Sequence, residues 1–131
     1  MSEPRCVVDA SAVLAWLFKE RGEDAVDKVL PFAVLSAVNL AEVLYRAREE
    51  GLSSSTLQQD LEGYGVTIEA FEAAEARLVT DVRDLARRAN VSLSLADCCC
   101  LATAMQRQLP AIGGDQAWEA LDLPIELLPF R

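Results

Sequence analysis

The chain has 131 residues, of which 52% are hydrophobic and 25% are charged, and its formal net charge is −9. This length and apolar content predict one domain with a single core over residues 1–131 and exclude a disordered chain. The chain contains no histidine, which excludes histidine-based catalytic triads and histidine-ligated zinc. The acidic balance excludes a generally basic coat for nucleic acid, so such contact would need a local basic patch or metal ions.

The cysteines and the hydropathy pattern predict the compartment. Cys6 and the run Cys98–Cys100 form neither a disulfide framework nor a CxxC zinc spacing. We expect them to be reduced and to pack as small apolar residues. No apolar run has the length of a membrane span, and the N-terminus lacks a signal-peptide pattern. These features predict a cytoplasmic protein without membrane contact.

Short apolar runs alternate with helical patterns in the first half of the chain. Residues 5–9 predict a strand buried on both faces, and the helix that follows begins near Ser11 and ends at Gly22. The next predicted elements are a short helix that ends at Pro31, a strand over 32–36, a helix from 39 to Gly51, and a helix capped within 53–55.

The second half continues the alternation. Its predicted elements are a strand over 65–68, a long helix over 69–89, a helix from Ser94 to about Gln108, a strand over 111–115 and a last strand over 125–128. Ser94 is the expected N-cap, which places Asp97 at the third position of its helix. Strands that alternate with helices predict an α/β sandwich with a mostly parallel sheet.

Four acidic residues stand where such a sheet binds ligands. Asp9 and Asp115 each end a predicted strand, Asp97 opens a helix, and Glu42 lies in the first turns of another helix. Carboxylates among apolar neighbours are costly unless paired or metal-bound, and clustered carboxylates repel one another. Oxygen ligands alone favour Mg²⁺ or Mn²⁺, which would activate water for phosphoryl chemistry.

Each of these residues also has an ordinary structural interpretation. Asp97 and Asp115 are also typical helix N-terminal residues, and Glu42 is also typical of a solvated helix face. Asp9 is the hardest to explain in this way, because a strand-end aspartate after a buried run has few structural uses.

Four segments together resemble the PIN domain, and more closely the VapC-type toxins of prokaryotic toxin–antitoxin pairs. They are Val7–Ala12, Asn39–Leu44, Leu93–Asp97 and Gly113–Trp118. The resemblance spans essentially the whole chain, in order and at family-like spacing. No single motif is specific, but four acids in four matching contexts are.

The resemblance implies a three-layer α/β/α sandwich and a metal site made of Asp9, Glu42, Asp97 and Asp115. Ser11 and Asn39 would be accessory polar residues, and the cofactor would be Mg²⁺ or Mn²⁺. The implied activity is endoribonuclease cleavage of structured RNA, such as tRNA or rRNA, leaving a 5′-phosphate and a 3′-hydroxyl. The implied partners are a cognate antitoxin, which places a basic side chain at the site, and a second copy of the chain.

The chain departs from the family pattern at two positions. Gly113 stands where the family often has Thr or Ser, so a hydroxyl near the metal is missing, and Cys98 stands where Arg is frequent. Arg46 and Arg48 follow Glu42 and are candidates for RNA contact, although a solvated helix face explains them equally. The same holds for the row Arg77, Arg83, Arg87 and Arg88.

Two alternatives to the ribonuclease remain open. The same fold could be a catalytically weak binding module held by a protein partner, because of Gly113. Another doubly wound phosphotransfer domain, such as a receiver or a haloacid-dehalogenase-like phosphatase, fits less well. The latter requires an aspartate two residues after the first, where this chain has Ser11.

Overall fold

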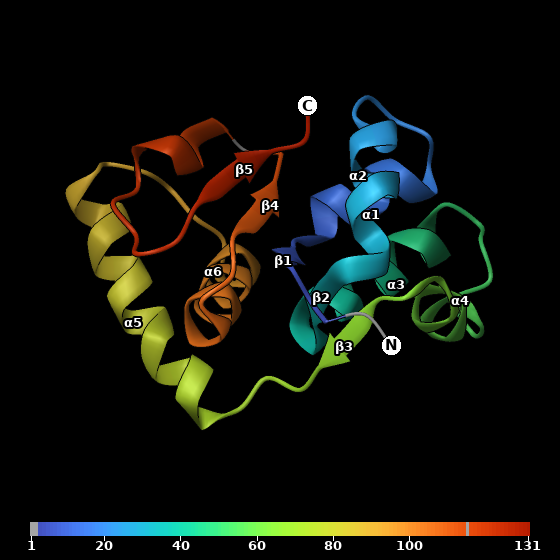
Figure 1. Ribbon diagram of the computed structural model, residues 1–131, viewed down its shortest axis with the longest axis horizontal. Coiled ribbons are helices and arrows are strands. Elements are labelled where there is room, and N and C mark those ends of the chain that lie inside the picture. Colours follow the sequence, from blue (N-terminus) through green and yellow to red (C-terminus); the bar gives the residue numbers. More distant parts are fainter. Residues whose placement is uncertain (1–2, 115) are drawn as a thin grey trace.

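Five strands form the central sheet in the order β3-β2-β1-β4-β5, and every pairing is parallel (Figure 1). In the computed structural model, which describes residues 3–114 and 116–131, the strands are β1 (Cys6–Val8), β2 (Ala33–Ser36), β3 (Thr67–Glu69), β4 (Ala111–Gly113) and β5 (Leu127–Pro129). The predicted α/β fold with a mostly parallel sheet is confirmed. The strand order reverses between β1 and β4, and in open α/β sheets such a reversal creates a crevice at the carboxyl ends of the strands.

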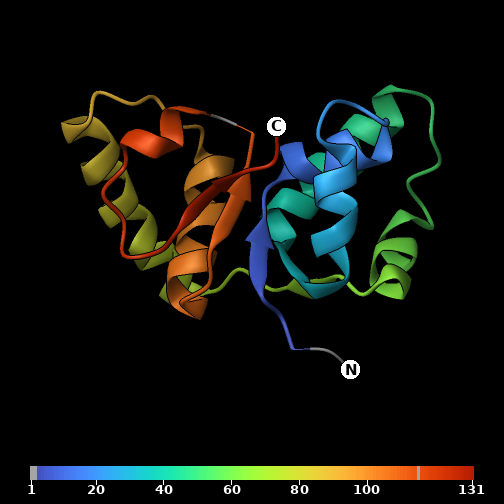
Figure 2. The ribbon, with the colours of Figure 1, turned by 45° about the horizontal axis from the view of Figure 1, so that its top comes forward.

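Helices cover both faces of this sheet and complete three layers (Figures 1 and 2). One layer holds α1 (Ala10–Leu17), α2 (Glu23–Val29), α3 (Ala37–Glu49) and α4 (Leu57–Tyr64). The other holds α5 (Ala73–Arg88) and α6 (Leu95–Arg107). Two short 3-10 helices, η1 (Leu30–Phe32) and η2 (Gln116–Ala120), precede β2 and follow β4.

Alternate residues of the strands pack on opposite faces of the sheet and form two buried clusters, where the sequence predicts a single core. Val8 and Leu35 pack with α1, α2, α3 and α4, whereas Val7 and Val34 pack with α5 and α6 on the opposite face. All four side chains are fully buried. Strands buried on both faces read as continuous apolar runs, which is the pattern that the sequence shows.

Several element boundaries differ from the predictions: β3 and β5 begin two residues later than expected, and α3 begins two residues earlier. Glu69 pairs with Ser36 in the sheet, so it belongs to β3 and the long helix begins only at Ala73. Gly22 has a φ of 94° and precedes α2, whereas α1 has already ended at Leu17. The N-cap of α4 is Thr56, not a residue within 53–55. Sheet pairing sets the boundary at Glu69, and a left-handed turn sets the one at Gly22. Neither feature produces a periodic pattern of apolar residues in the sequence.

The four cysteines are buried and unpaired, as the sequence predicts. Burial raises the pKa of Cys6 to about 11. Within the described ranges, none of the helices combines the length and the apolar character needed to cross a membrane.

Candidate active site

The crevice between β1 and β4 holds the first predicted acid. Val8 pairs with Ile112, and the backbone N–H of Asp9 donates to the Ile112 carbonyl at 3.1 Å. At the second residue of α1, Ser11 Oγ accepts a hydrogen bond from the Gly114 N–H at 3.2 Å. The chain segments after β1 and β4 are therefore tied together at the carboxyl edge of the sheet, which is the top of Figure 2.

Asp9 is the N-cap of α1 and is only 5% exposed. The Ser11 hydroxyl lies 2.7 and 2.9 Å from its two carboxylate oxygens, and the Ala12 N–H donates to Oδ1 at 3.0 Å. Burial raises the pKa of Asp9 to about 6, against the lowering effect of the bonds from Ser11 and Ala12. The charges of Asp97 and Glu42 raise this pKa further.

Asp97 occupies the third position of α6, as predicted, and is part of a capping box. Its backbone N–H donates to Ser94 Oγ at 3.1 Å, and its carboxylate accepts from the Ser94 N–H at 3.2 Å. Both bonds satisfy helix N-terminal donors, so the helix start itself orients the carboxylate. Asp97 remains partly exposed, which leaves one side of it accessible from solvent.

Two residues of α3 complete the described part of the site. Asn39 is 1% exposed, and its Nδ2 donates to the Ala96 carbonyl at 3.1 Å. This bond joins α3 of one layer to the first turn of α6 in the other, next to Asp97. Asn39 Oδ1 is buried and has no partner within the described residues. Glu42 lies almost one turn further along α3, and its side chain is exposed.

The donors around Asp9 fit a divalent cation in their chemistry but not in their number. Within residues 3–114 and 116–131, no group of three or more acidic or thiol side chains is close enough to hold a metal ion. Asp115, the fourth predicted ligand, lies outside the described residues. The donor chemistry nevertheless fits a hard divalent cation, because Asp9, Asp97 and the unpartnered Asn39 Oδ1 offer only oxygen atoms. The described residues therefore offer donors of the type that a hard cation prefers, without forming a metal-binding group among themselves.

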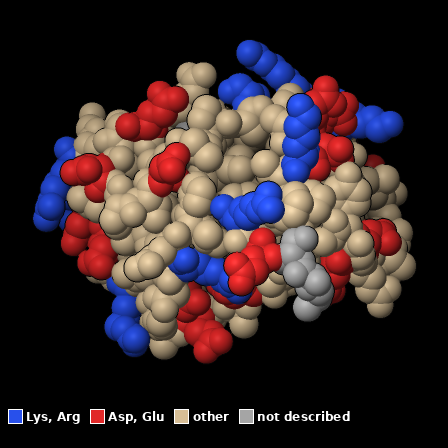
Figure 3. Space-filling view, in the orientation of Figure 1, with Lys and Arg blue, Asp and Glu red and all other residues tan. Residues whose placement is uncertain are grey.

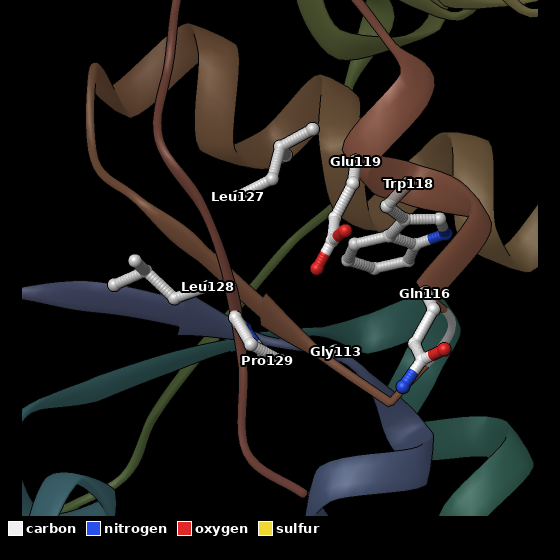
Figure 4. A pocket seen from close by; sticks show the side chains of 7 residues that line it. All are labelled: Gly113, Gln116, Trp118, Glu119, Leu127, Leu128 and Pro129. Carbon is white, nitrogen blue, oxygen red and sulfur yellow. The ribbon is translucent and has the colours of Figure 1, made fainter.

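The missing hydroxyl at position 113 has a structural reason. The indole ring of Trp118, in η2, packs directly over Gly113 (Figure 4). A Cβ placed on Gly113 would lie 2.5 Å from Trp118 Cζ3, closer than atoms can approach. Trp118 is 2% exposed and belongs to the core. With this tryptophan in place, a serine or threonine at position 113 cannot be accommodated.

Basic side chains near the site are scattered. Figure 3 shows Lys and Arg interspersed with Asp and Glu on the described part of one face. Arg46 forms an exposed ion pair with Glu49, with 3.5 Å between Nε and Oε1, and Arg48 is exposed. Their contact with RNA stays a prediction. The sequence pattern did not predict that Arg131 lies near this edge of the sheet. Its Nη2 would lie 2.8 Å from a Cβ placed on Gly114. Only the path of the last segment past β4 brings it to this edge.

Comparison with known proteins places this geometry in a family. A model of the PIN domain matches residues 6–123. The DNA-bound VapBC structure from Salmonella typhimurium superimposes with a TM-score of 0.73 at 15% identity, covering 98% of this chain and 99% of that chain. A toxin–antitoxin complex from Klebsiella pneumoniae gives 0.71 at 18% identity, with coverages of 93% and 99%. VapBC-5 from Mycobacterium tuberculosis gives 0.62 at 19% identity, with coverages of 96% and 99%. No curated protein sequence matches the chain.

Proposed function

Because this chain belongs to the PIN domain family, we propose that it is a divalent-metal-dependent endoribonuclease and the toxin of a VapBC-type pair. The observation that carries the proposal is the setting of Asp9. Its carboxylate is buried at the crevice of the sheet, and the charges of Asp97 and Glu42 bear on it. Carboxylates alone would repel an RNA phosphate, so this arrangement is useful for RNA cleavage only with a cation.

In the proposed reaction a water oxygen attacks phosphorus and the P–O3′ bond breaks, leaving a 5′-phosphate and a 3′-hydroxyl. Asp9, Glu42, Asp97 and Asp115 would hold Mg²⁺ or Mn²⁺, which when bound supplies an activated water and neutralises charge on the phosphate. Ser11 orients the Asp9 carboxylate through its hydroxyl. Asn39 holds the first turn of α6, and with it Asp97, against α3.

The proposed partners are an antitoxin, a structured RNA such as tRNA or rRNA, and a second copy of the chain. The similar solved structures support the first, because their titles name toxin–antitoxin complexes. Exposed apolar side chains offer surface for a protein partner: Tyr45 on α3 is 63% exposed, and Leu52, which follows α3, is 43% exposed. An antitoxin that covers this surface would keep the toxin inactive until the antitoxin is lost.

The experiment is RNA cleavage by the purified chain with Mg²⁺ or Mn²⁺, on total tRNA and on rRNA. We expect cleavage that EDTA stops and that Asp97→Ala reduces by at least about 100-fold, because the metal site loses a ligand. Asp84→Ala, which removes an exposed acid from the middle of α5, is the matched control and should cleave normally. Cleavage that persists in EDTA or in Asp97→Ala would contradict the proposal.

A catalytically weak binding module is the second candidate. Two observations favour it: no three-acid group stands among the described residues, and Trp118 excludes a hydroxyl at position 113. Folded protein, free of any partner, that cuts no RNA with any metal would select this candidate.

A further inference from the structure

A cleft of about 340 Å³ lies between the end of α5 and the segment that leads into α6. Its polar lining consists of Arg83, Arg87, Asn90 and Ser92, and three apolar residues form the rest. Arg83 and Arg87 are four residues apart on α5 and therefore share one face of the helix. Asn90 has a φ of 56° and turns the chain back over this face.

The charge of this cleft is unbalanced. No acidic residue lines it, and in the described part of the chain neither arginine forms an ion pair. Arg83 has one long contact, 3.5 Å from Nη1 to the Leu93 carbonyl. In a chain with a net charge of −9, two unpaired guanidinium groups in one concave site favour an anionic ligand.

The donors in the cleft match a phosphate group. Guanidinium groups bind phosphate oxygens through paired N–H donors, and hydroxyl and amide side chains commonly add further bonds to the nucleic-acid backbone. The Ser92 hydroxyl and the Asn90 side-chain amide make no hydrogen bond in the described structure and are both exposed. Four side chains with hydrogen-bond donors therefore line one cleft.

The cleft and the carboxylate site lie on the same side of the molecule. In Figure 2 the end of α5 and the segment after it lie at the upper end of the molecule, which is also the end toward which the strands point. Arg83 contacts Leu93, the residue before the Ser94–Asp97 capping box. Leu93 and Asp97 are four positions apart, so their Cα atoms lie within about 14 Å of each other.

We propose that the Arg83–Arg87 cleft binds a backbone phosphate of the RNA, a few nucleotides from the bond that is cut. The identity of the ligand rests on the proposed ribonuclease function. The cleft holds the strand without reading its sequence, because phosphates are the same at every nucleotide. It thereby supplies a local basic site on a chain with a net charge of −9.

A second cleft with two basic residues does not fit this role. Arg5 and Lys28 line it together with apolar side chains, but the Arg5 guanidinium stacks over the Phe32 ring at 4.3 Å. Arg5 also precedes β1, so this cleft lies at the opposite end of the strands from Asp9.

The test measures the affinity for labelled total tRNA in EDTA, where the proposed enzyme cannot cut, at salt concentrations from about 50 to 200 mM. The variants are Arg87→Gln, the double variant Arg83→Gln/Arg87→Gln and the control Arg88→Gln. Arg88 lies on the same helix but does not line the cleft. Arg87 makes no hydrogen bond through its side chain, so its substitution should leave the fold intact.

We expect the double variant to bind about tenfold more weakly at low salt, with a salt slope smaller by about 0.7 for each phosphate that the protein no longer neutralises. In cleavage assays its KM should rise while kcat is retained. If the double variant has the same affinity and salt slope as Arg88→Gln, the proposed phosphate binding in the cleft is contradicted. Arginine-dependent binding without cleavage under any metal supports the cleft and contradicts the nuclease. Cleavage without arginine dependence does the reverse, and a wild-type chain that binds no RNA contradicts both.

Discussion

Asp9 and Asp97 are two carboxylates of the proposed site, and both stand at the start of a helix, yet their surroundings differ. Asp9 follows a buried strand and is 5% exposed, and burial raises its pKa to about 6. Asp97 is partly exposed and exchanges two hydrogen bonds with Ser94. Both helix N-termini favour a negative charge, but only Asp9 loses its hydration.

At Asp9 the charge that the proposed function needs lowers the stability of the fold. At Asp97 the same charge serves both the proposed function and stability. The ionised form of Asp9 is disfavoured in the folded state, so this charge lowers the stability of the metal-free protein at neutral pH. The Asp97 carboxylate caps α6 and therefore contributes to stability even without a bound ligand. The buried acid is therefore the one whose presence is hard to explain without a function.

The pH dependence of stability should show the largest effect. Between the unfolded pKa of Asp9, 3.8, and its folded pKa, about 6, the folded state binds more protons than the unfolded state. Stability in EDTA should therefore fall as pH rises through this window and level off above it, by on the order of 3 kcal/mol. Urea unfolding of the wild type and Asp9→Asn at several pH values isolates this contribution as their difference. If the difference in unfolding free energy between the wild type and Asp9→Asn does not vary with pH, burial does not raise the pKa of Asp9, and the contrast with Asp97 is contradicted.

Asp9→Asn should stabilise the metal-free protein at pH 7 by about 2 kcal/mol, because it removes the buried charge and keeps an acceptor for the Ala12 N–H. The Ser11 hydroxyl can accept from the new amide. Urea unfolding in EDTA measures the gain, and Asp84→Asn, an exposed acid on α5, is the matched control. A loss of stability in Asp9→Asn would show that Asp9 is structural.

Asp97→Ala should have the opposite sign and a smaller size. Removing the capping carboxylate leaves the Ser94 N–H without its partner, which should lower the free energy of unfolding by about 1 kcal/mol. Asp97→Glu keeps the charge and can still reach back to the same N–H, so it should recover most of the loss. Unchanged stability in Asp97→Ala would indicate that the capping box contributes nothing.

The smallest effect should be the coupling between the two capping residues. Ser94→Ala and Asp97→Ala each break a reciprocal bond, so the double variant should be less destabilised than the sum of the single variants by about 0.5 kcal/mol. Pairing Asp97→Ala with Thr56→Ala, at the start of α4 where no side-chain cap bond forms, should give additive values. Additivity in both cycles would mean that Ser94 and Asp97 act independently.

Much of this architecture could be predicted from local patterns. The doubly buried runs around Val7 and Val34 became neighbouring strands, and Ser94 and Asp97 formed the expected cap because both partners lie within three residues. The positions of Asp9 and Asp97 at one edge follow from parallel topology. The start of the helix after Glu69 could not be predicted, because pairing with β2 overrides a helical pattern that extends to that residue.

The order of strands and helices along the chain, the two apolar faces of the sheet and the capping of α6 follow from local sequence, because each depends on residues a few positions apart. The other features of the site arise from contacts between distant parts of the chain. Asn39 reaches Ala96 across 57 positions, and Gly114 reaches Ser11 across 103. Trp118 determines that position 113 is a glycine, and the fold around Asp9 raises its pKa. These features depend on which surfaces meet and how much water they exclude. Neither can be predicted from the periodicity of the sequence.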